Sequence, residues 1–227
     1  PGRNHPGYTR RGSLMNMTHQ TTRPMIPIGH PLAARIAVPG SKSHTNRALL
    51  LAALAQGTTW LRQALFSDDS GYFSEALRHL GFEVHTDPGT QTITVQGMGG
   101  QIPAADADLF IGNAGTAARF LTAMLTLGQG HYRLDGVARM RQRPIGDLVA
   151  ALNNLGAHVA ATTPALTADR HAQCPPVTIQ AAGLPGGTTP IRGDTSSQYL
   201  SALLMVAPQA SRPVEITISG PLHSRPY

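Results

Sequence analysis

The chain has 227 residues, enough for one large domain or two modest ones with a hydrophobic core. Charged residues make up 13% and hydrophobic residues 41%, which excludes intrinsic disorder, a state that needs low hydrophobicity. The longest unbroken apolar run covers residues 48–55, far short of the roughly 20 residues that span a bilayer. The single Cys174 excludes an internal disulfide and a cysteine zinc cluster. We therefore expect a soluble globular protein of the cytoplasm.

The net charge of +6 is concentrated at the start of the chain. Before Asp68 there are eight Lys and Arg and no acid, whereas the remainder has 10 Arg and 12 acids, a balance of 10 − 12 = −2. A basic arm is typical of nucleic-acid binding, but aromatic residues make up only 5% and do not interleave with the arginines, so we expect no nucleic-acid partner. Lys42 is the only lysine among 18 basic residues, which indicates a specific requirement at that position.

Residues 1–30 contain Pro, Arg, His, Thr and Gly without an apolar period, which predicts a flexible basic leader before a domain over residues 31–227. An organelle transit peptide is the alternative, but the prolines of this segment argue against an amphipathic helix. An upstream extension or an inter-domain linker is the favoured interpretation.

From Arg35 onward the chain repeats itself. Small polar residues open three almost wholly apolar runs of helix length, at residues 41–55, 115–127 and 196–207. Because these runs are apolar all round, we expect three buried helices. Amphipathic helices that end in Leu-Gly lie between the runs, and their final residues Gly81 and Gly156 stand 75 residues apart (156 − 81 = 75) where left-handed C-caps are expected.

Alternating apolar residues at 91–96, 177–180 and 214–219 predict strands between these helices. The expected fold class is α/β, with a unit of about 75 residues present about three times. The third unit is cut short, because a further Leu-Gly helix should follow the last strand. We therefore expect the chain to be a portion of a longer protein.

The openings of the apolar helices favour anions, because helix N-termini present free N–H groups and a partial positive charge. Ser43 shares a helix face with Arg47, four residues on, and Thr116 shares one with Arg119, three residues on. Further arginines lie in the loop at residues 136–146, namely Arg139, Arg141 and Arg143. This combination predicts a site for phosphate and carboxylate groups.

Each feature also has a structural explanation when taken alone. A Ser or Thr at a helix start is most often just an N-cap, and an arginine-rich loop is most often solvated. Asp68 and Asp69 are either first-turn acids of a capped helix or part of the site. Cys174 beside two prolines has no apparent role, and the 10 His show no metal-ligand spacing.

Taken together, six ordered motifs resemble the 5-enolpyruvylshikimate-3-phosphate synthase family from about residue 30 to the end. They are Pro-Gly-Ser-Lys-Ser with Asn-Arg-Ala-Leu-Leu-Leu at 39–51, Ser-Asp-Asp at 67–69, Gly-Asn-Ala-Gly-Thr-Ala at 112–117, Arg-Met-Arg-Gln-Arg-Pro-Ile-Gly at 139–146, Ser-Ser-Gln at 196–198 and Ser-Arg-Pro-Tyr at 224–227. The resemblance implies an enolpyruvyl-transferase-type domain of repeated α/β units, with buried parallel helices and outer sheets. It also implies that a second domain is missing.

The resemblance further implies transfer of the carboxyvinyl group of phosphoenolpyruvate to the 5-hydroxyl of shikimate-3-phosphate. By matching position, shikimate-3-phosphate would be bound by Lys42, Ser43, Arg47, Ser196, Ser197, Gln198, Ser224 and Tyr227. Phosphoenolpyruvate would be bound by Lys42, Gly115, Arg143 and Gln198. The reaction belongs to the shikimate pathway of aromatic amino acid biosynthesis, and glyphosate competes at the phosphoenolpyruvate site.

In that family the general acid and base lie in the other half of the enzyme. The resemblance therefore implies no catalytic residue, metal or cofactor in this chain, whose partner is the C-terminal half of a monomeric enzyme. We expect no turnover by the chain alone. Ala118 stands where many members have Met and Phe120 where many have Pro, a departure beside the phosphoenolpyruvate site.

Two alternatives stay open at this point. One is a UDP-N-acetylglucosamine enolpyruvyl transferase, although that family typically has a reactive cysteine in an arginine-bearing loop and Cys174 lies outside residues 139–143. The other is a non-catalytic anion-binding fragment.

Overall fold

The computed structural model describes residues 24–29, 31, 33–162 and 173–222. The chain divides into residues 1–37 and 38–227, and the described residues of the first part form no helix or strand. The leader predicted over residues 1–30 lies mostly outside the described residues, as do Ser224 and Tyr227. The domain boundaries therefore stay a prediction.

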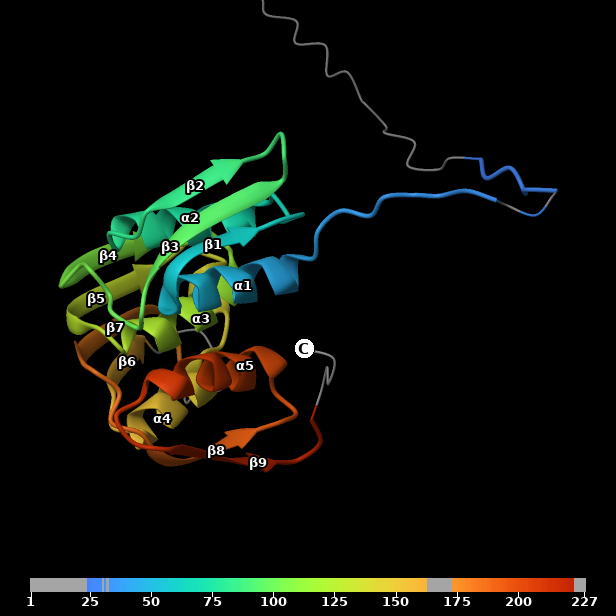
Figure 1. The fold of residues 1–227 in the computed structure, drawn as a ribbon. Coiled ribbons are helices and arrows are strands. Elements are labelled where there is room, and N and C mark those ends of the chain that lie inside the picture. Colours follow the sequence, from blue (N-terminus) through green and yellow to red (C-terminus); the bar gives the residue numbers. More distant parts are fainter. Residues whose placement is uncertain (1–23, 30, 32, 163–172, 223–227) are drawn as a thin grey trace, which may run out of the picture. The chain divides into compact units, whose positions relative to one another are not determined.

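The second part contains the five helices and nine strands described (Figure 1). The helices are α1 (Lys42–Leu54), α2 (Asp68–His79), α3 (Gly115–Leu125), α4 (Gly146–Asn154) and α5 (Ser197–Val206), with short 3-10 turns η1 (Met140–Gln142) and η2 (Ala207–Gln209). The strands are β1 (Gln56–Leu61), β2 (Val84–Asp87), β3 (Thr92–Met98), β4 (Asp106–Phe110), β5 (Gln129–Asp135), β6 (His158–Thr162), β7 (Cys174–Ala182), β8 (Gly187–Arg192) and β9 (Val214–Ser219).

The sheets confirm the repeat expected from the sequence. One sheet has the order β1-β3-β2 and is antiparallel throughout. A second has the order β4-β5-β7-β6, in which β5-β7-β6 repeats the first arrangement and β4 adds a parallel strand beside β5. The pair β8-β9 is parallel and repeats β4-β5. The α/β unit is therefore present about three times.

The two Leu-Gly helix ends are equivalent, as predicted. Gly81 follows α2 and Gly156 follows α4, and both have φ of +89°, the left-handed region that glycine adopts without strain. A Cβ on either glycine would meet a proline, Pro103 beside Gly81 and Pro185 beside Gly156. The same local chemistry ends the amphipathic helix in both repeats.

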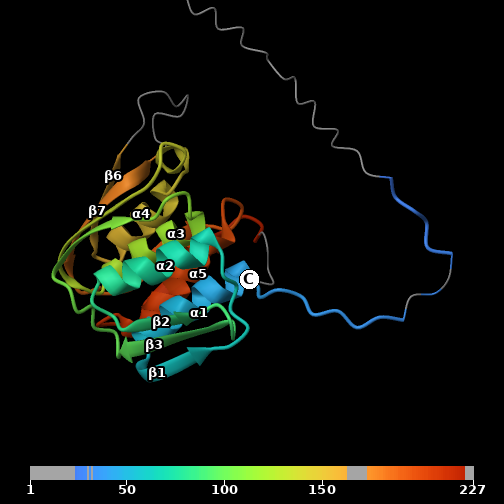
Figure 2. The same cartoon turned by 90° about the horizontal axis from the view of Figure 1, so that it is seen from above.

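Helix α3 lies at the centre of the core, in contact with the other four helices. Every residue of α3 is buried, which confirms the expectation for this run. Figures 1 and 2 show α1 and α5 next to α3, with the strands outside the helices. The expectation is wrong for one side of α1 and α5, where Leu51 is 48% and Leu204 56% exposed. Every residue of α3 is thus buried, whereas α1 and α5 each keep an exposed side.

None of the helices that the structure describes is long and apolar enough to cross a membrane.

Candidate functional site

The predicted site residues come from three helix beginnings, as the sequence indicated. Lys42, Gly115 and Ser197 are the first residues of α1, α3 and α5. Ser196 is the N-cap of α5, and its hydroxyl accepts a hydrogen bond from the Gln198 amide at 3.2 Å. The predicted residues therefore stand at helix beginnings, where the first N–H groups have no partner within their own helix.

Side-chain contacts show that the three helices run side by side in the same direction. The Arg47 Nη2 of α1 donates to the Ser201 hydroxyl of α5 at 2.8 Å, and its guanidinium lies 5.3 Å from the centre of the Phe120 ring of α3. The three residues lie at similar distances from the starts of their helices: Arg47 is the sixth residue of α1, Ser201 the fifth of α5 and Phe120 the sixth of α3. At the helix starts, Gln198 Nε2 donates to the Thr116 hydroxyl at 3.3 Å. The parallel arrangement brings the site residues of all three helices together.

Arg47 also donates from Nη1 to the Ser43 carbonyl at 3.0 Å. Nη1 is thus oriented within α1 and Nη2 toward α5, and the ring of Phe120 packs against the guanidinium. The sequence motifs did not identify Ser201. Its position four residues after Ser197, on the same helix face, was the available signal.

Lys42 is 51% exposed and its Nζ lies 3.7 Å from Asp69 Oδ1 of α2. Asp68 and Asp69 are first-turn acids of α2, capped by Ser67, which forms a capping box with Ser70. The structural explanation for these two acids is therefore correct, and Asp69 additionally faces the only lysine. An exposed pair of this kind contributes about 1 kcal/mol or less.

Arg143 meets the beginning of α3 although 27 residues separate it from Thr116 (143 − 116 = 27). Its Nη1 donates to the Asn113 carbonyl at 3.0 Å, and its guanidinium covers Gly115 so closely that a Cβ there would overlap it. A side chain at position 115 would therefore displace the Arg143 guanidinium, a constraint that the motif alone did not supply.

A buried carboxylate anchors the loop that carries Arg143. Asp135, 7% exposed, ends β5 and accepts hydrogen bonds from Arg141 Nε and Nη2 at 3.0 and 2.8 Å. It also accepts from Arg133 Nη2 at 2.6 Å and from the Gly136 amide at 2.8 Å. Burial by itself raises the pKa of Asp135, but these hydrogen bonds outweigh it and lower the pKa below 3.8.

The structure gives Arg119 and Arg141 acceptors within the protein. Arg141 is bound to Asp135, and Arg119 is buried with its nitrogens on backbone carbonyls. Arg139 donates to the Gln142 side chain at 3.2 Å, so it is held along the loop. Residue spacing predicted which arginines share an element, but their acceptors are set by distant segments.

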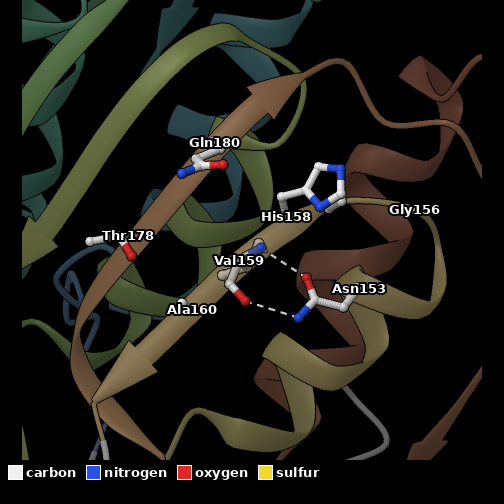
Figure 3. A pocket seen from close by; sticks show the side chains of 8 residues that line it. Asn153, Gly156, His158, Val159, Ala160, Thr178 and Gln180 are labelled. Carbon is white, nitrogen blue, oxygen red and sulfur yellow. Dashed lines mark hydrogen bonds between the residues drawn. The ribbon is translucent and has the colours of Figure 1, made fainter.

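A separate hollow of about 490 Å³ lies between α4 and the outer strands (Figure 3). Its most polar wall is Asn153, whose side chain accepts from the Val159 amide at 2.8 Å and donates to the Val159 carbonyl at 2.9 Å. His158, Thr178 and Gln180 add further polar side chains to the lining. No arginine, lysine or carboxylate lines this hollow, so it does not match the chemistry predicted for the site.

Cys174 is buried and its thiol is free. Burial raises the pKa of this thiol, which disfavours the reactive thiolate. Among the residues that the structure describes, no three His, Cys, Asp or Glu side chains gather as they would around a metal ion.

The site and fold define a repeated α/β domain whose helix beginnings gather cationic and hydroxyl groups suited to anions. A family model described as EPSP synthase (3-phosphoshikimate 1-carboxyvinyltransferase) matches residues 26–227. The chain therefore belongs to this family.

Similar proteins agree with that assignment. The 3-phosphoshikimate 1-carboxyvinyltransferase of Shewanella denitrificans is 53% identical over 193 residues, covering 85% of this chain and 44% of that protein. The Trichormus variabilis protein of the same name is 48% identical over 200 residues, covering 88% and 45%. A solved EPSP synthase from Acinetobacter baumannii superposes with a TM-score of 0.71 at 27% identity, covering 83% of this chain and 41% of that one. The chain thus spans less than half the length of these relatives.

Proposed function

We propose that this chain forms the substrate-binding half of a carboxyvinyl transferase. The reaction is transfer of the carboxyvinyl group of phosphoenolpyruvate to the 5-hydroxyl of shikimate-3-phosphate, with release of phosphate. The observation that carries the proposal is the convergence of three helix beginnings, joined by the Gln198–Thr116 hydrogen bond and covered by Arg143 at Gly115. Both substrates are polyanions, which such a site binds.

Each substrate is assigned to one side of this site. Phosphoenolpyruvate is bound by Lys42, Gly115, Arg143 and Gln198. Shikimate-3-phosphate is bound by Lys42, Ser43, Arg47, Ser196, Ser197 and Gln198, together with Ser224 and Tyr227, which lie outside the described residues. The support is geometric, because Arg47 and Gln198 each link two of the helices that supply these residues.

The chain's own contribution is binding and orientation. Lys42 provides a compact positive charge for phosphate or carboxylate, and Arg143 provides a planar fork. Proton transfer is assigned to the C-terminal half of the same enzyme, which is the partner of this chain in a monomeric, cytoplasmic protein. The chain alone therefore binds its substrates without turning them over.

The first test is calorimetric titration of the purified chain with shikimate-3-phosphate, with UDP-N-acetylglucosamine as the comparator. We expect saturable binding of shikimate-3-phosphate alone, lost in Arg47→Ala. Arg78→Ala is the matched control, because Arg78 of α2 also donates to a backbone carbonyl, that of Val84 at 2.9 Å. Binding of UDP-N-acetylglucosamine, or equal binding by wild type and Arg47→Ala, contradicts the proposal.

A second test separates an enzyme half from a non-catalytic anion-binding fragment. The chain is mixed with a separately produced C-terminal half of the Shewanella denitrificans relative, and phosphate release is measured. We expect release only when both halves and both substrates are present. Release by the chain alone contradicts the division of roles, and no release by the mixture favours the non-catalytic fragment.

A further inference from the structure

Arg119 is a buried cation whose acceptors are backbone carbonyls. It lies in the second turn of α3 and is 6% exposed. Its Nη1 donates to the Gly115 carbonyl and its Nη2 to the Pro144 carbonyl, each at 2.8 Å, and its Nε has no partner. No salt bridge to a carboxylate forms at Arg119 within the part of the chain that the structure describes. The guanidinium charge is thus buried without an anionic neighbour.

This arrangement is costly for folding alone. Burial lowers the pKa of Arg119; Tyr199 acts against this shift, and the positive charge of Arg143 adds to it. Buried ionic groups contribute little to stability, and apolar side chains of similar volume often replace them without loss. A structural role in the core therefore gives no reason for arginine at this position, and its two acceptors indicate what it does instead.

Both acceptors belong to the immediate surroundings of Arg143. Pro144 is the next residue along the chain, and Gly115 is the residue that the Arg143 guanidinium covers. The Pro144 carbonyl accepts a second hydrogen bond, from the hydroxyl of the buried Tyr199 at 2.7 Å. The Arg119 guanidinium lies 5.9 Å from the centre of the Tyr199 ring. One carbonyl beside Arg143 is therefore held by α3 and α5 together.

We propose that Arg119 is a positioning residue, which sets the place of the Arg143 guanidinium by holding the Pro144 and Gly115 carbonyls, with Tyr199 as its partner on Pro144. Arg119 itself does not touch ligand. The ligand affected is the one that Arg143 binds, phosphoenolpyruvate, and this part of the inference rests on the proposed function. The neighbouring ligand, held by Ser43 and Arg47, is expected to be unaffected.

The test uses two variants with matched controls. Arg119→Met keeps the aliphatic stem and removes both donors, and Tyr199→Phe removes one hydroxyl and keeps the ring. Tyr132→Phe is the control for the second, because the Tyr132 hydroxyl also donates to a backbone carbonyl, that of Ala104 at 2.7 Å, from a buried ring. Arg78→Met is the control for the first.

The first readout is amide hydrogen exchange of residues 139–146 in the ligand-free chain. We expect exchange about tenfold faster in Arg119→Met and about threefold faster in Tyr199→Phe, from loss of two and one hydrogen bonds respectively. Both controls are expected to match wild type. Exchange equal to wild type in Arg119→Met and Tyr199→Phe overturns the inference, whichever ligands the chain binds.

The second readout is the affinity for phosphoenolpyruvate at saturating shikimate-3-phosphate. We expect a loss of about tenfold in Arg119→Met, with the affinity for shikimate-3-phosphate within about twofold of wild type. Equal loss of both affinities indicates a general structural role and overturns the inference. If wild type binds neither ligand, the proposed function fails, and the exchange experiment alone decides whether Arg119 positions Arg143.

Discussion

The arginines on the outer face of the sheet β4-β5-β7-β6 and those at the helix beginnings have different kinds of acceptor. On the sheet, Arg133 lies between two carboxylates, 3.1 Å from Asp108 and 2.6 Å from Asp135. At the helix beginnings, Arg143 donates to the Asn113 carbonyl. A carboxylate neutralises a guanidinium, whereas a carbonyl orients it and leaves its charge available.

On the outer face a histidine also lies beside a carboxylate, since His131 Nδ1 is 3.6 Å from Asp106 Oδ1 on the neighbouring strand. For Arg133 and Arg143, the kind of acceptor distinguishes a neutralised guanidinium from one that keeps its charge. Exposure alone does not, because Arg133 and Arg143 are both partly exposed.

The substitution with the largest expected effect, Gly115→Ala, disturbs only the site at the helix beginnings. In Gly115→Ala, the new Cβ overlaps the Arg143 guanidinium, which must leave its place. We expect phosphoenolpyruvate affinity to fall about 100-fold, the loss of a charge-assisted contact worth about 2.7 kcal/mol. Calorimetry at saturating shikimate-3-phosphate measures it. Gly71→Ala is the control, because a Cβ at Gly71 in α2 meets nothing within 4 Å, and unchanged affinity in Gly115→Ala contradicts the role of Arg143.

The second prediction concerns the arginines that are bound by carboxylates. Asp135→Asn loses the charge that holds Arg133 and Arg141, and we expect the free energy of unfolding at pH 7 to fall by about 2 kcal/mol. Because the folded-state pKa of Asp135 is below 3.8, this stabilisation is fully present above the unfolded pKa of about 3.9 and is lost as pH falls through the folded value.

Urea unfolding of wild type and Asp135→Asn from pH 7 to pH 2.5 checks this prediction. The difference between the two proteins should be constant above about pH 5 and shrink as pH falls. Asp108→Asn, which removes only the exposed partner of Arg133, should cost less than about 1 kcal/mol. A difference that grows toward low pH is incompatible with a lowered pKa.

The third effect is one on stability and should leave the site intact. Gly81→Ala and Gly156→Ala place a side chain in the left-handed region and against a proline. We expect each to lower the free energy of unfolding by about 1 to 3 kcal/mol, by similar amounts, because the two helix ends are equivalent. Denaturant unfolding measures the loss. Ligand affinities that change in either variant would show that the helix ends and the site are not independent.

The smallest effect concerns Asp69, whose carboxylate lies 3.7 Å from the Lys42 Nζ. In Asp69→Asn the Lys42 pair is lost, and we expect the free energy of unfolding to change by less than about 1 kcal/mol, because Lys42 is half exposed. The measurement is urea unfolding at low and at high salt, and the difference between the two proteins should shrink at high salt, because salt screens exposed charges. A loss above 2 kcal/mol would mean that this pair supports the fold of α1 and α2.

Much of the fold was predictable because its signals are local. Gly81 and Gly156 mark the ends of two helices, and Ser196 marks the start of a third, since C-caps and N-caps depend on a few neighbouring residues. The apolar run of α3 predicted its burial, and the motifs predicted the family that the comparisons confirm. The exposed sides of α1 and α5 were not predictable, because an apolar run does not say which neighbours are present.

The roles of individual arginines required the tertiary structure. Arg119, Arg141 and Arg143 look alike in sequence, all near helix-starting motifs, yet they bind a pair of carbonyls, a buried carboxylate and a single carbonyl. Tyr199 and Asp135 were missed for the same reason, because nothing in their local sequence identifies them as anchors of a loop.

By itself, the sequence determined the α/β repeat, the three helix beginnings and the family, since each depends on local patterns and short motifs. Only the tertiary structure decided which guanidinium pairs with a carboxylate, which is buried and which is held by a single carbonyl. Arg119 reaches a carbonyl 25 residues away and Arg47 a hydroxyl 154 residues away. A guanidinium takes its role from the acceptor that folding brings within 3 Å, and that acceptor comes from another segment of the chain.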